Sequence, residues 1–378
     1  MKYNEGVFGM EATKVHINDL RVGKIVSEDI YANTQYPILL KNTKLSQEHL
    51  YILKAFNIVQ IPILLDGKDQ ERKEKKESED KSELVNVAVE QVVVVDRFGN
   101  KYNDVIDEFK KMFNGWGAGA KIDITKVRAM ILPLVEKILE DRTIIFDLNS
   151  FSNAKDYLYH HCIATGLISA AIAQKLGYER GYVLQMAIAG TLADCGMARI
   201  PLRIREKKEP LNQLEFNEIR KHPIFSLQMV KNLPALKEEM KEAIYQHHER
   251  LDGSGYPEKL RVGSVSNFGQ IIAVADTFHA MTSERLYRLK ESPFKVIEKI
   301  KESEFGKFDI QVVQALVDLV AALPIGTKIE LSNLERGEIM FINKFAPTRP
   351  LIKLSSSGEI IDLSKNRSFY ISRVITNE

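Results

Sequence analysis

Histidines and two aspartates concentrate in one central stretch of this chain, and their residue types suit a metal site. Six of the eight histidines lie inside or beside residues 161–276, where the apolar spacing predicts helices. Asp194 within LADCG and Asp276 within VADTF stand in apolar surroundings. An unpaired buried carboxylate is too costly, so each must be paired, hydrogen-bonded or bound to a metal ion. Histidines and carboxylates brought together by several helices are a usual metal-binding arrangement. The six histidines are His160, His161, His222, His247, His248 and His279.

No single one of these residues carries the prediction, because a histidine on a helix more often packs or faces solvent than binds a metal. His247 and His248 are adjacent, and consecutive helical residues point about 100° apart, so both reach one metal only from the edge of a helix face. Cys162 and Cys195 each follow a ligand candidate and therefore point away from it, which favours a packing role. Only the ordered set of motifs favours metal binding over packing.

The composition sets broad limits on the protein. Its 378 residues suffice for two or three domains with a sizeable core. Lysine and arginine total 53 against 51 for aspartate and glutamate, so the net charge of +2 gives no global electrostatic reason to expect DNA, RNA or membrane binding. The first ten residues lack the apolar core of a signal peptide, and no apolar run could span a bilayer. With no CxxC pair, the chain is expected to be cytoplasmic and free of disulfides.

The N-terminal part predicts a small α+β module. KVHINDLRVGKIVSEDIYA is typical of two strands around a turn at Val22-Gly23, YPILLKNTKL of a hairpin and VQIPIL of a further strand. SQEHLYILKAFNI predicts a helix that Ser46 caps and that has Glu48 in its first turn. We expect this module to regulate or to dock protein partners, without chemistry of its own.

The remaining chain predicts mainly helices. Residues 66–83 are charged and lack large apolar side chains, which is typical of a solvated linker. The β-branched NVAVEQVVVV predicts a strand, although a helical continuation is open, and helical periodicity follows in three segments. SPFKVIEKIKES and DIQVVQALVDLVAAL predict two closing helices, and the last fifty residues alternate like strands without a basic or glycine signature for a nucleotide site. The three helical segments are residues 103–113, 123–141 and about 150–176.

Five motifs occur in a fixed order: DYLYHHC, LADCGMARIP, IRKHP, QHHERLDGSGYP and AVADTFHAMTSERLYR. This series resembles the HD-GYP domain, the metal-dependent phosphodiesterase branch of the HD superfamily that acts on cyclic di-GMP in bacterial signalling. The resemblance implies a mostly α protein, in which an HD-type helical bundle stands between a small N-terminal α+β module and a small C-terminal β appendage. The expected divisions are residues 1–65 for the module, 66–83 for the linker, 84–145 for a strand and lead-in helices, 146–324 for the metal-site domain and 325–378 for the β appendage.

The resemblance also implies roles for individual residues. Two divalent metal ions are expected, iron or manganese, with a single bound ion as the alternative; they would activate a water and clamp the phosphodiester. Asp194 matches the bridging aspartate of the HD pair, and Gly253, Gly255 and Tyr256 match the loop that names the family. Arg285 and Arg288 stand where basic residues face ligand phosphates, a task that suits arginine. The other implied ligands are His161 and Asp276 for the first metal, and His222, His247 and His248 for the second.

Four positions depart from the family pattern. Ala193 replaces the histidine of the HD pair, which removes a ligand of the first metal, and Met197 replaces a lysine. His279 stands where a second aspartate is usual, and Leu286 replaces a proline. Because His279 lies three residues after Asp276 on the same helix face, one hypothesis is that it substitutes for the missing imidazole and acts in catalysis with Asp194. The alternative is that His279 only packs or hydrogen-bonds.

Three functions remain open from the residues. The first is a phosphodiesterase that hydrolyses cyclic di-GMP or a related cyclic dinucleotide with an altered first metal site. The second is a catalytically inactive cyclic di-GMP receptor that signals through its flanking domains, as Ala193 and Met197 favour. The third, a pure interaction scaffold, is least consistent with the retained ligand set. Retention of His222, His247, His248 and Asp276 together favours catalysis slightly.

Overall fold

The computed structural model describes residues 12–17, 20–30, 39–46, 49, 50, 53, 58, 60–64, 80–284, 290–303 and 305–375, with the side chains of residues 12, 80–97 and 303 excepted. The chain divides into two compact units, Met1–Val92 and Val93–Glu378.

The first unit contains a small antiparallel sheet. Strand β1 (Ala12–His16) pairs with β2 (Gln60–Leu64), and isolated bridges join Ile25 to Lys44 and Ile30 to Leu39. The predicted strand in VQIPIL and the turn at Gly23, whose φ is +96°, are confirmed. At the predicted cap, Ser46 Oγ accepts a hydrogen bond from the His49 amide at 3.3 Å, whereas Glu48 lies outside the described residues. Val26, Leu45 and Ile61 are among the buried side chains that form its core.

The strand predicted at NVAVEQVVVV is wrong, because helix α2 (Asp80–Gly117) runs through it. The β-branched run favours a strand only weakly, and tertiary context often overrides such a local preference. The C-terminal half of α2 buries Tyr102, Phe109 and Phe113 in the main core, so the helix is anchored from that end. The last four residues of the expected linker, 80–83, also belong to α2.

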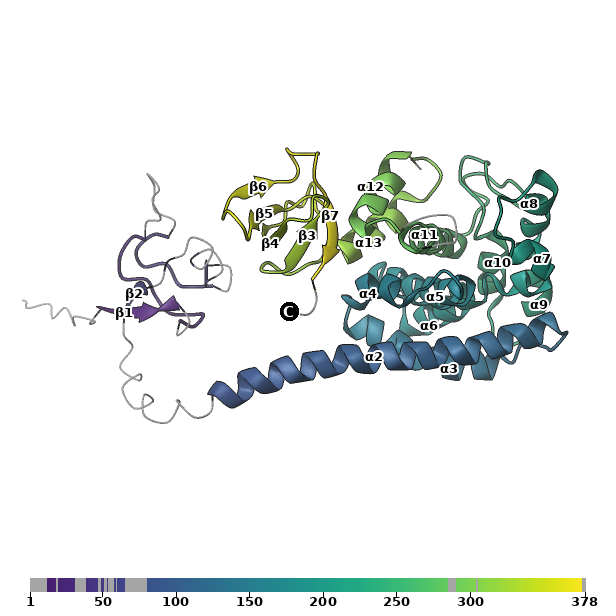
Figure 1. The fold of residues 1–378 in the computed structure, drawn as a ribbon, viewed down its shortest axis with the longest axis horizontal. Helices are drawn as coiled ribbons and strands as arrows, with labels where there is room; N and C mark the ends of the chain where they lie inside the picture. Colours follow the sequence, from purple (N-terminus) through teal and green to yellow (C-terminus); the bar gives the residue numbers. More distant parts are fainter. Residues whose placement is uncertain are drawn as a thin grey trace, which may run out of the picture. The chain divides into compact units, whose positions relative to one another are not determined.

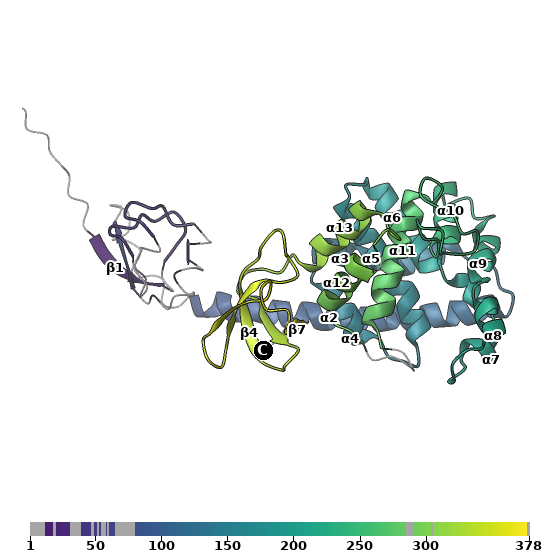
Figure 2. The ribbon, with the colours of Figure 1, turned by 90° about the horizontal axis from the view of Figure 1, so that it is seen from above.

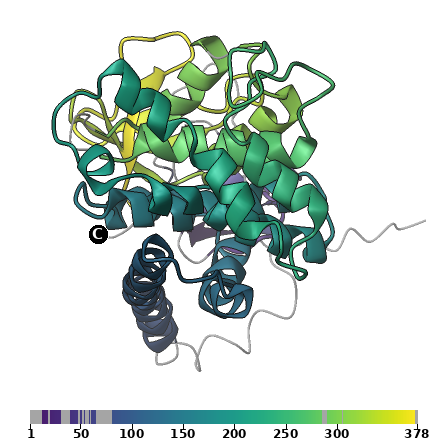
Figure 3. The ribbon, with the colours of Figure 1, turned by 90° about the vertical axis from the view of Figure 1, so that its right-hand side faces the viewer.

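Two further helices lead into the bundle. Helix α3 (Ile124–Glu140) begins where expected, because the Asp123 carboxylate caps it by accepting bonds from the amides of Thr125 and Lys126. Helix α4 (Ile144–Phe151) follows after a short turn. Figure 3 shows α2 and α3 end-on, lying side by side below the rest of the helical unit.

Two helices cross at the centre of the bundle. Helix α5 (Tyr157–Lys175) and α6 (Arg180–Leu192) have almost every residue of their central turns buried. They meet at glycines: a Cβ on Gly166 would lie 2.2 Å from Thr191 Oγ1, and one on Gly190 would lie 2.9 Å from the Gly166 Cα. Only glycine permits this approach, which brings the middle of α5 against the C-terminal end of α6.

Short helices surround this pair and carry the remaining site residues. They are the 3₁₀ helix η3 (Cys195–Arg199), α7 (Leu202–Arg205), α8 (Gln213–Ile219), α9 (His222–Val230), α10 (Glu238–Gln246) and the longer α11 (Asn267–Thr282). Figure 1 shows α11 lying over α5, with α8, α9 and α10 grouped at one end.

The C-terminal strands belong to the same compact unit as the helices. After α12 (Pro293–Ser303) and α13 (Ile310–Val320), the sheet contains β3 (Lys328–Leu331), β4 (Arg336–Phe341), β5 (Leu351–Leu354), β6 (Ile360–Asp362) and β7 (Ile371–Val374). All neighbours are antiparallel in the order β6-β5-β4-β3-β7. Figure 2 shows this sheet beside α12 and α13. The Arg349 guanidinium forms two bonds of 2.6 Å to the Glu298 carboxylate across this junction.

The predicted fold class is confirmed: the chain is mostly helical, with small sheets near its two ends. None of the described helices combines the length and apolar character needed to cross a membrane.

Candidate metal centre

Two clusters of histidine and aspartate side chains form inside the helical bundle. One contains Asp194, His222, His247 and His248, and the other contains His161, Asp194 and Asp276. Within each cluster the potential ligand atoms all lie within 4.8 Å of one another. Asp194 belongs to both, and its two oxygens face different clusters: Oδ1 lies 3.0 Å from His222 Nε2, whereas Oδ2 lies 3.4 Å from His161 Nε2. This is the arrangement of a carboxylate that could bridge two metal ions.

The four-residue cluster forms where several elements begin or end. Asp194 lies between α6 and η3, His222 opens α9, and His247 and His248 directly follow α10. Gly196 holds η3 against α9, because a Cβ there would lie 2.1 Å from the His222 carbonyl oxygen. The Gly196 amide also donates to Ser226 Oγ at 2.8 Å. Close packing of backbone therefore fixes the separation of Asp194 and His222.

The hydrogen bonds of His222 and His247 direct the lone pairs of their Nε2 atoms toward a common centre. His222 Nδ1 must donate to the Ile219 carbonyl at 2.8 Å, and His247 Nδ1 must donate to the Ile244 carbonyl at 2.6 Å. In neutral imidazoles both Nε2 atoms are then acceptors, yet they lie only 3.2 Å apart and close to Asp194 Oδ1. These groups repel unless a proton or a cation lies between them, so the donor set fits a divalent metal ion.

The three-residue cluster joins α5, α11 and the Asp194 junction. His161 Nε2 lies 2.8 Å from Asp276 Oδ1, and the second oxygen of Asp276 lies 3.8 Å from His248 Nδ1. Tyr157, one turn before His161, stacks on its imidazole with ring centres 5.2 Å apart. One imidazole and two carboxylates are a reasonable but incomplete ligand set for a divalent metal, with positions left for water or substrate.

The charge of the centre also fits cations. Burial alone would raise the pKa of Asp194, but hydrogen bonds from His222 and His247 outweigh it and hold that pKa well below its usual range. Burial likewise opposes ionisation of Asp276, yet nearby His248 and His161 lower its pKa. For His248 burial is the main cause, and it lowers the pKa of the imidazole well below its usual value. Two carboxylates therefore stay ionised at the centre, and among the described residues their ion-pair partners are all histidines.

The structure places His279 behind His161 and outside both clusters. Its Nδ1 lies 2.9 Å from Nδ1 of His161, the ring nitrogen that faces away from the carboxylates. Its Nε2 lies 3.1 Å from Ser283 Oγ. This position differs from the one that the sequence hypothesis requires, in which His279 would itself face the metal.

Ala193 and Met197 supply no polar group in place of the residues that the resemblance implies. Ala193 is buried, and its carbonyl accepts a 2.6 Å bond from Ser226 Oγ, so its backbone is held in place without a side-chain ligand. Met197 packs partly buried against the core, and its carbonyl accepts a bond from Arg205.

A glycine-rich loop covers one side of the four-residue cluster. Tyr256 stacks on His248 with ring centres 4.6 Å apart, and its amide donates to the His248 carbonyl at 3.2 Å. Gly253 has a φ of +80°. Gly255 packs against the backbone of His248, because a Cβ on Gly255 would lie 2.6 Å from the His248 carbonyl oxygen. These residues of DGSGYP therefore hold a tyrosine ring over a candidate ligand.

Glu249 positions this loop, and sequence reasoning missed it. Its fully buried carboxylate accepts bonds from the amides of Glu258, Lys259 and Leu260 at 2.6, 3.1 and 2.9 Å. The Glu249 side chain thus supplies the acceptors for three consecutive amides of the loop. The signal was present in QHHER, where an acidic residue directly follows two ligand candidates.

The predicted phosphate contacts Arg285 and Arg288 lie outside the described residues, as does Leu286. Within the described chain, Arg220 is a cation beside the same loop: its guanidinium lies 4.6 Å from the centre of the Tyr256 ring. Arg220 has no ion-pair partner among the described residues, and it is only half-buried. It stands two residues before His222, in IRKHP.

Both cysteines are free and buried, and neither belongs to a cluster. Burial raises the pKa of Cys195 to about 12 and that of Cys162 well above its usual value. Both therefore remain thiols, which agrees with the packing role expected from their position beside ligand candidates.

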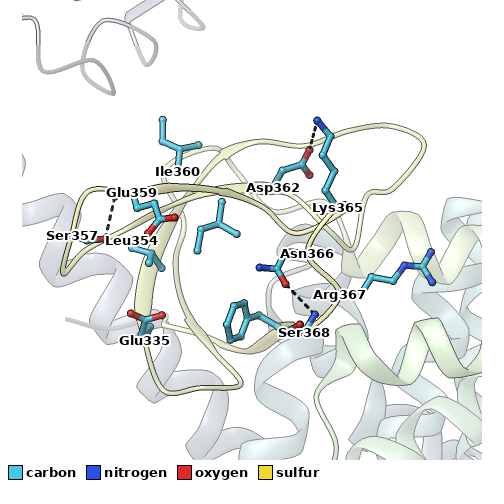
Figure 4. Close-up of a pocket in the computed structure, with 12 residues that line it drawn as sticks. Glu335, Leu354, Ser357, Glu359, Ile360, Asp362, Lys365, Asn366, Arg367 and Ser368 are labelled. Atoms are coloured by element: carbon cyan, nitrogen blue, oxygen red, sulfur yellow. Dashed lines mark hydrogen bonds and ion pairs between the residues drawn. The ribbon is translucent and has the colours of Figure 1, made fainter.

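A hollow of about 1060 Å³ lies in the C-terminal sheet, away from these clusters (Figure 4). Its charged lining is mixed in sign, and Lys365 is paired with Asp362 at 3.7 Å. Ser357 Oγ accepts a bond from the Glu359 amide at its rim. The described lining therefore has no concentration of one charge.

Comparisons with known proteins agree with the geometry. Residues 133–312 match the family model described as HD domain. A cyclic di-GMP phosphodiesterase of Pseudomonas aeruginosa is 26% identical over 262 residues, which cover 67% of this chain and 63% of the relative. One from Thermotoga maritima is 35% identical over 176 residues, covering 46% of this chain and 47% of the relative.

Another relative is named for a different cyclic dinucleotide. A 3'3'-cGAMP-specific phosphodiesterase of Vibrio cholerae is 31% identical over 165 residues, covering 43% of this chain and 37% of the relative. A solved structure of an HDG"Y"P protein from Bdellovibrio bacteriovorus is 17% identical, with a TM-score of 0.46 over 82% of this chain and 99% of that one. The chain spans less than two thirds of the length of each of these curated relatives.

Proposed function

We propose that this chain, whose residues 133–312 match the HD-domain family model, is a metal-dependent phosphodiesterase that hydrolyses cyclic di-GMP. The observation that carries the proposal is the pair of clusters that share Asp194, one oxygen to each. Two adjoining metal positions suit an in-line displacement at phosphorus. The phosphodiesterase names of the relatives support the substrate class.

The side chains of the centre would hold two divalent cations, iron or manganese. Bound there, these ions supply Lewis acidity to a water nucleophile and to the oxygens of the phosphodiester. Asp194 holds the two positions at a set separation, and His222 and His247 are oriented by their carbonyl partners so that Nε2 faces inward. Burial of these residues excludes bulk water and strengthens every electrostatic interaction with a phosphate.

Arg220 and Tyr256 would receive the ligand at the mouth of the centre. The guanidinium of Arg220, beside the Tyr256 ring, supplies a donor fork that suits a phosphate. Burial raises the pKa of Tyr256, so its phenol stays protonated and can donate a hydrogen bond. We expect Arg220→Ala to raise KM for cyclic di-GMP by about tenfold or more with a smaller change in kcat, measured by steady-state kinetics.

The experiment that tests the proposal is a product assay. Protein purified without oxygen and supplied with iron or manganese is incubated with cyclic di-GMP, and the products are separated by chromatography. A linear dinucleotide or GMP above the level of a His247→Ala control is expected. A parallel incubation with 3'3'-cGAMP distinguishes between the two substrates for which the relatives are named.

The second candidate function is a receptor that binds cyclic di-GMP without cleaving it. It is favoured by Ala193, which leaves the three-residue cluster without a fourth ligand. It is also favoured by Met197, which stands where the family resemblance implies a lysine. Intact ligand after incubation with folded, metal-loaded protein, together with binding measured by calorimetry, would replace the enzyme proposal by this one.

A further inference from the structure

The polar contacts behind His161 form a short chain that ends at Ser283. His161 Nδ1 lies 2.9 Å from His279 Nδ1, and His279 Nε2 lies 3.1 Å from Ser283 Oγ. We propose that His279 and Ser283 are positioning residues for the first metal position: they hold the His161 imidazole with Nε2 toward Asp194 and Asp276, and His279 accepts the Nδ1 proton of His161 when that Nε2 binds a cation. The proposal rests on the metal centre proposed above, but not on hydrolysis.

The contact between His161 Nδ1 and His279 Nδ1 has room for only one proton between the two nitrogens. At 2.9 Å one Nδ1 must donate and the other must accept. When His161 Nε2 binds a cation, its Nδ1 carries the proton and donates to His279 Nδ1. His279 then has its own proton on Nε2, where Ser283 Oγ is the acceptor.

The serine makes the chain satisfiable in either protonation pattern. A hydroxyl both donates and accepts, so Ser283 can also donate to His279 Nε2 when His161 Nε2 carries a proton toward Asp276 in the metal-free protein. The imidazole pair therefore keeps its position whether or not a cation is bound.

The surroundings fix the orientation of the chain. His279 and Ser283 are fully buried, and His161 is nearly so. The Tyr157 ring stacks on both imidazoles, with centres 5.2 Å from His161 and 6.4 Å from His279. Helix α11 carries His279 near its C-terminus, and the Ser283 amide donates to the His279 carbonyl at 3.0 Å. Competing water is thus kept from the contacts that orient the His161 imidazole.

The same geometry argues against His279 as a ligand. Both of its ring nitrogens have partners, and the atoms that face Asp194 and Asp276 belong to His161. An outer partner on the second ring nitrogen is the usual way in which a protein orients a ligating histidine. Here that partner is a neutral imidazole rather than a carboxylate.

The test measures metal binding without nucleotide. Manganese is titrated into the metal-free protein, and free manganese is followed by electron paramagnetic resonance. We expect two classes of site, with the three-residue cluster the weaker. His279→Ala should weaken binding at this class by roughly 10–100-fold, the usual effect of removing an outer partner, and leave the tighter class unchanged.

Two more variants separate positioning from packing. His279→Asp supplies an acceptor at the same place and should restore most of the lost affinity. Ser283→Ala removes the last hydrogen-bond partner in this series and should cause a smaller loss of manganese affinity at the same class of site. His160→Asn is the matched control, because His160 is a buried neighbour on α5 that contacts Asn153 and not the clusters. Melting of each metal-free variant checks its folding.

Loss of weaker-class manganese affinity in His279→Ala, with recovery in His279→Asp, supports the positioning role even if no nucleotide is hydrolysed. A failure of the positioning role can therefore be distinguished from a failure of the proposed function. Unchanged weaker-class affinity in both His279→Ala and Ser283→Ala would overturn it. A crystal structure of the manganese-loaded protein with a nitrogen of His279 on the metal would also overturn it.

Discussion

At the scale of single residues, Asp194 has the largest set of roles in this protein. Each of its carboxylate oxygens faces a different cluster, whereas Asp276 lies in only one. Binding of the two metal ions should therefore depend unequally on these two carboxylates.

The first prediction concerns metal content. Asp194→Asn leaves one oxygen and no negative charge, so we expect both metal ions to be lost, while Asp276→Asn should lose the ion of the three-residue cluster alone. Metal analysis of the purified variants after manganese loading measures this. Equal metal content in the two variants would contradict the bridging role.

The second prediction concerns a carboxyl group away from the centre. Burial, and secondarily the charge of Asp141, raises the pKa of Asp147 in α4 to about 6. The folded protein therefore binds this proton more tightly than the unfolded chain, and stability falls as pH rises from about 4 to about 6. Because Asp147 is partly exposed, we expect Asp147→Asn to stabilise the protein by only about 1–2 kcal/mol at pH 8.

Thermal melting of Asp147→Asn and the parent protein at several pH values checks this expectation. The difference in Tm should be largest above pH 7 and close to zero near pH 4. A difference that does not vary with pH would mean that packing, and not ionisation, separates the two proteins.

At the scale of elements, glycine contacts set the distances between the helices that carry the ligands. Gly166 and Gly190 bring α5 and α6 together, and Gly196 seats η3 on α9. His161 on α5 and Asp194 after α6 meet because these backbones approach so closely.

The third prediction follows from the α5–α6 crossing. In Gly166→Ala the new Cβ would lie 2.5 Å from the Ala187 carbonyl oxygen, so backbone must move, and we expect a loss of about 3 kcal/mol in the free energy of unfolding. Gly181→Ala on α6 is the matched control, because no atom lies within 4 Å of its Cβ. The control should gain up to about 1 kcal/mol from helix propensity. Chemical denaturation compares both, and equal effects would refute the packing argument.

At the scale of the whole molecule, the C-terminal sheet is continuous with the core of the helical unit. Ile329, Leu331 and Ile352 belong to the same buried cluster as the helices. The Arg349–Glu298 pair joins sheet and α12, with side chains only 15% and 21% exposed. The sheet should therefore contribute to the stability of the metal-bearing helices.

The fourth prediction tests this junction. Arg349→Met leaves the Glu298 carboxylate without its bidentate partner, and we expect a loss of about 1–3 kcal/mol, with a similar coupling to Glu298→Gln in a double-mutant cycle. Arg373→Met is the control, because Arg373 also pairs bidentately, with Glu330, but is 61% exposed and joins two strands of one sheet. It should change stability by less than about 1 kcal/mol. A coupling near zero at Arg349 would contradict the argument.

The sequence by itself determined the fold class and the candidate ligands. Apolar periodicity is a local signal, so helical segments such as residues 123–141 could be predicted from it. The motif order singled out His161, Asp194, His222, His247, His248 and Asp276, since residue type and position are enough to recognise ligand candidates. Local preference failed at residues 86–95, which are helical despite their β-branched side chains.

Only the tertiary structure decided which atoms face which cluster. The spacing of Asp276 and His279 places both on one helix face, yet it cannot say which ring nitrogen of a distant His161 contacts each of them. The role of Glu249 likewise depends on three amides nine to eleven residues away. Such contacts arise when packed helices bring separate segments together, so the distances that control the chemistry are properties of the fold and not of any one motif.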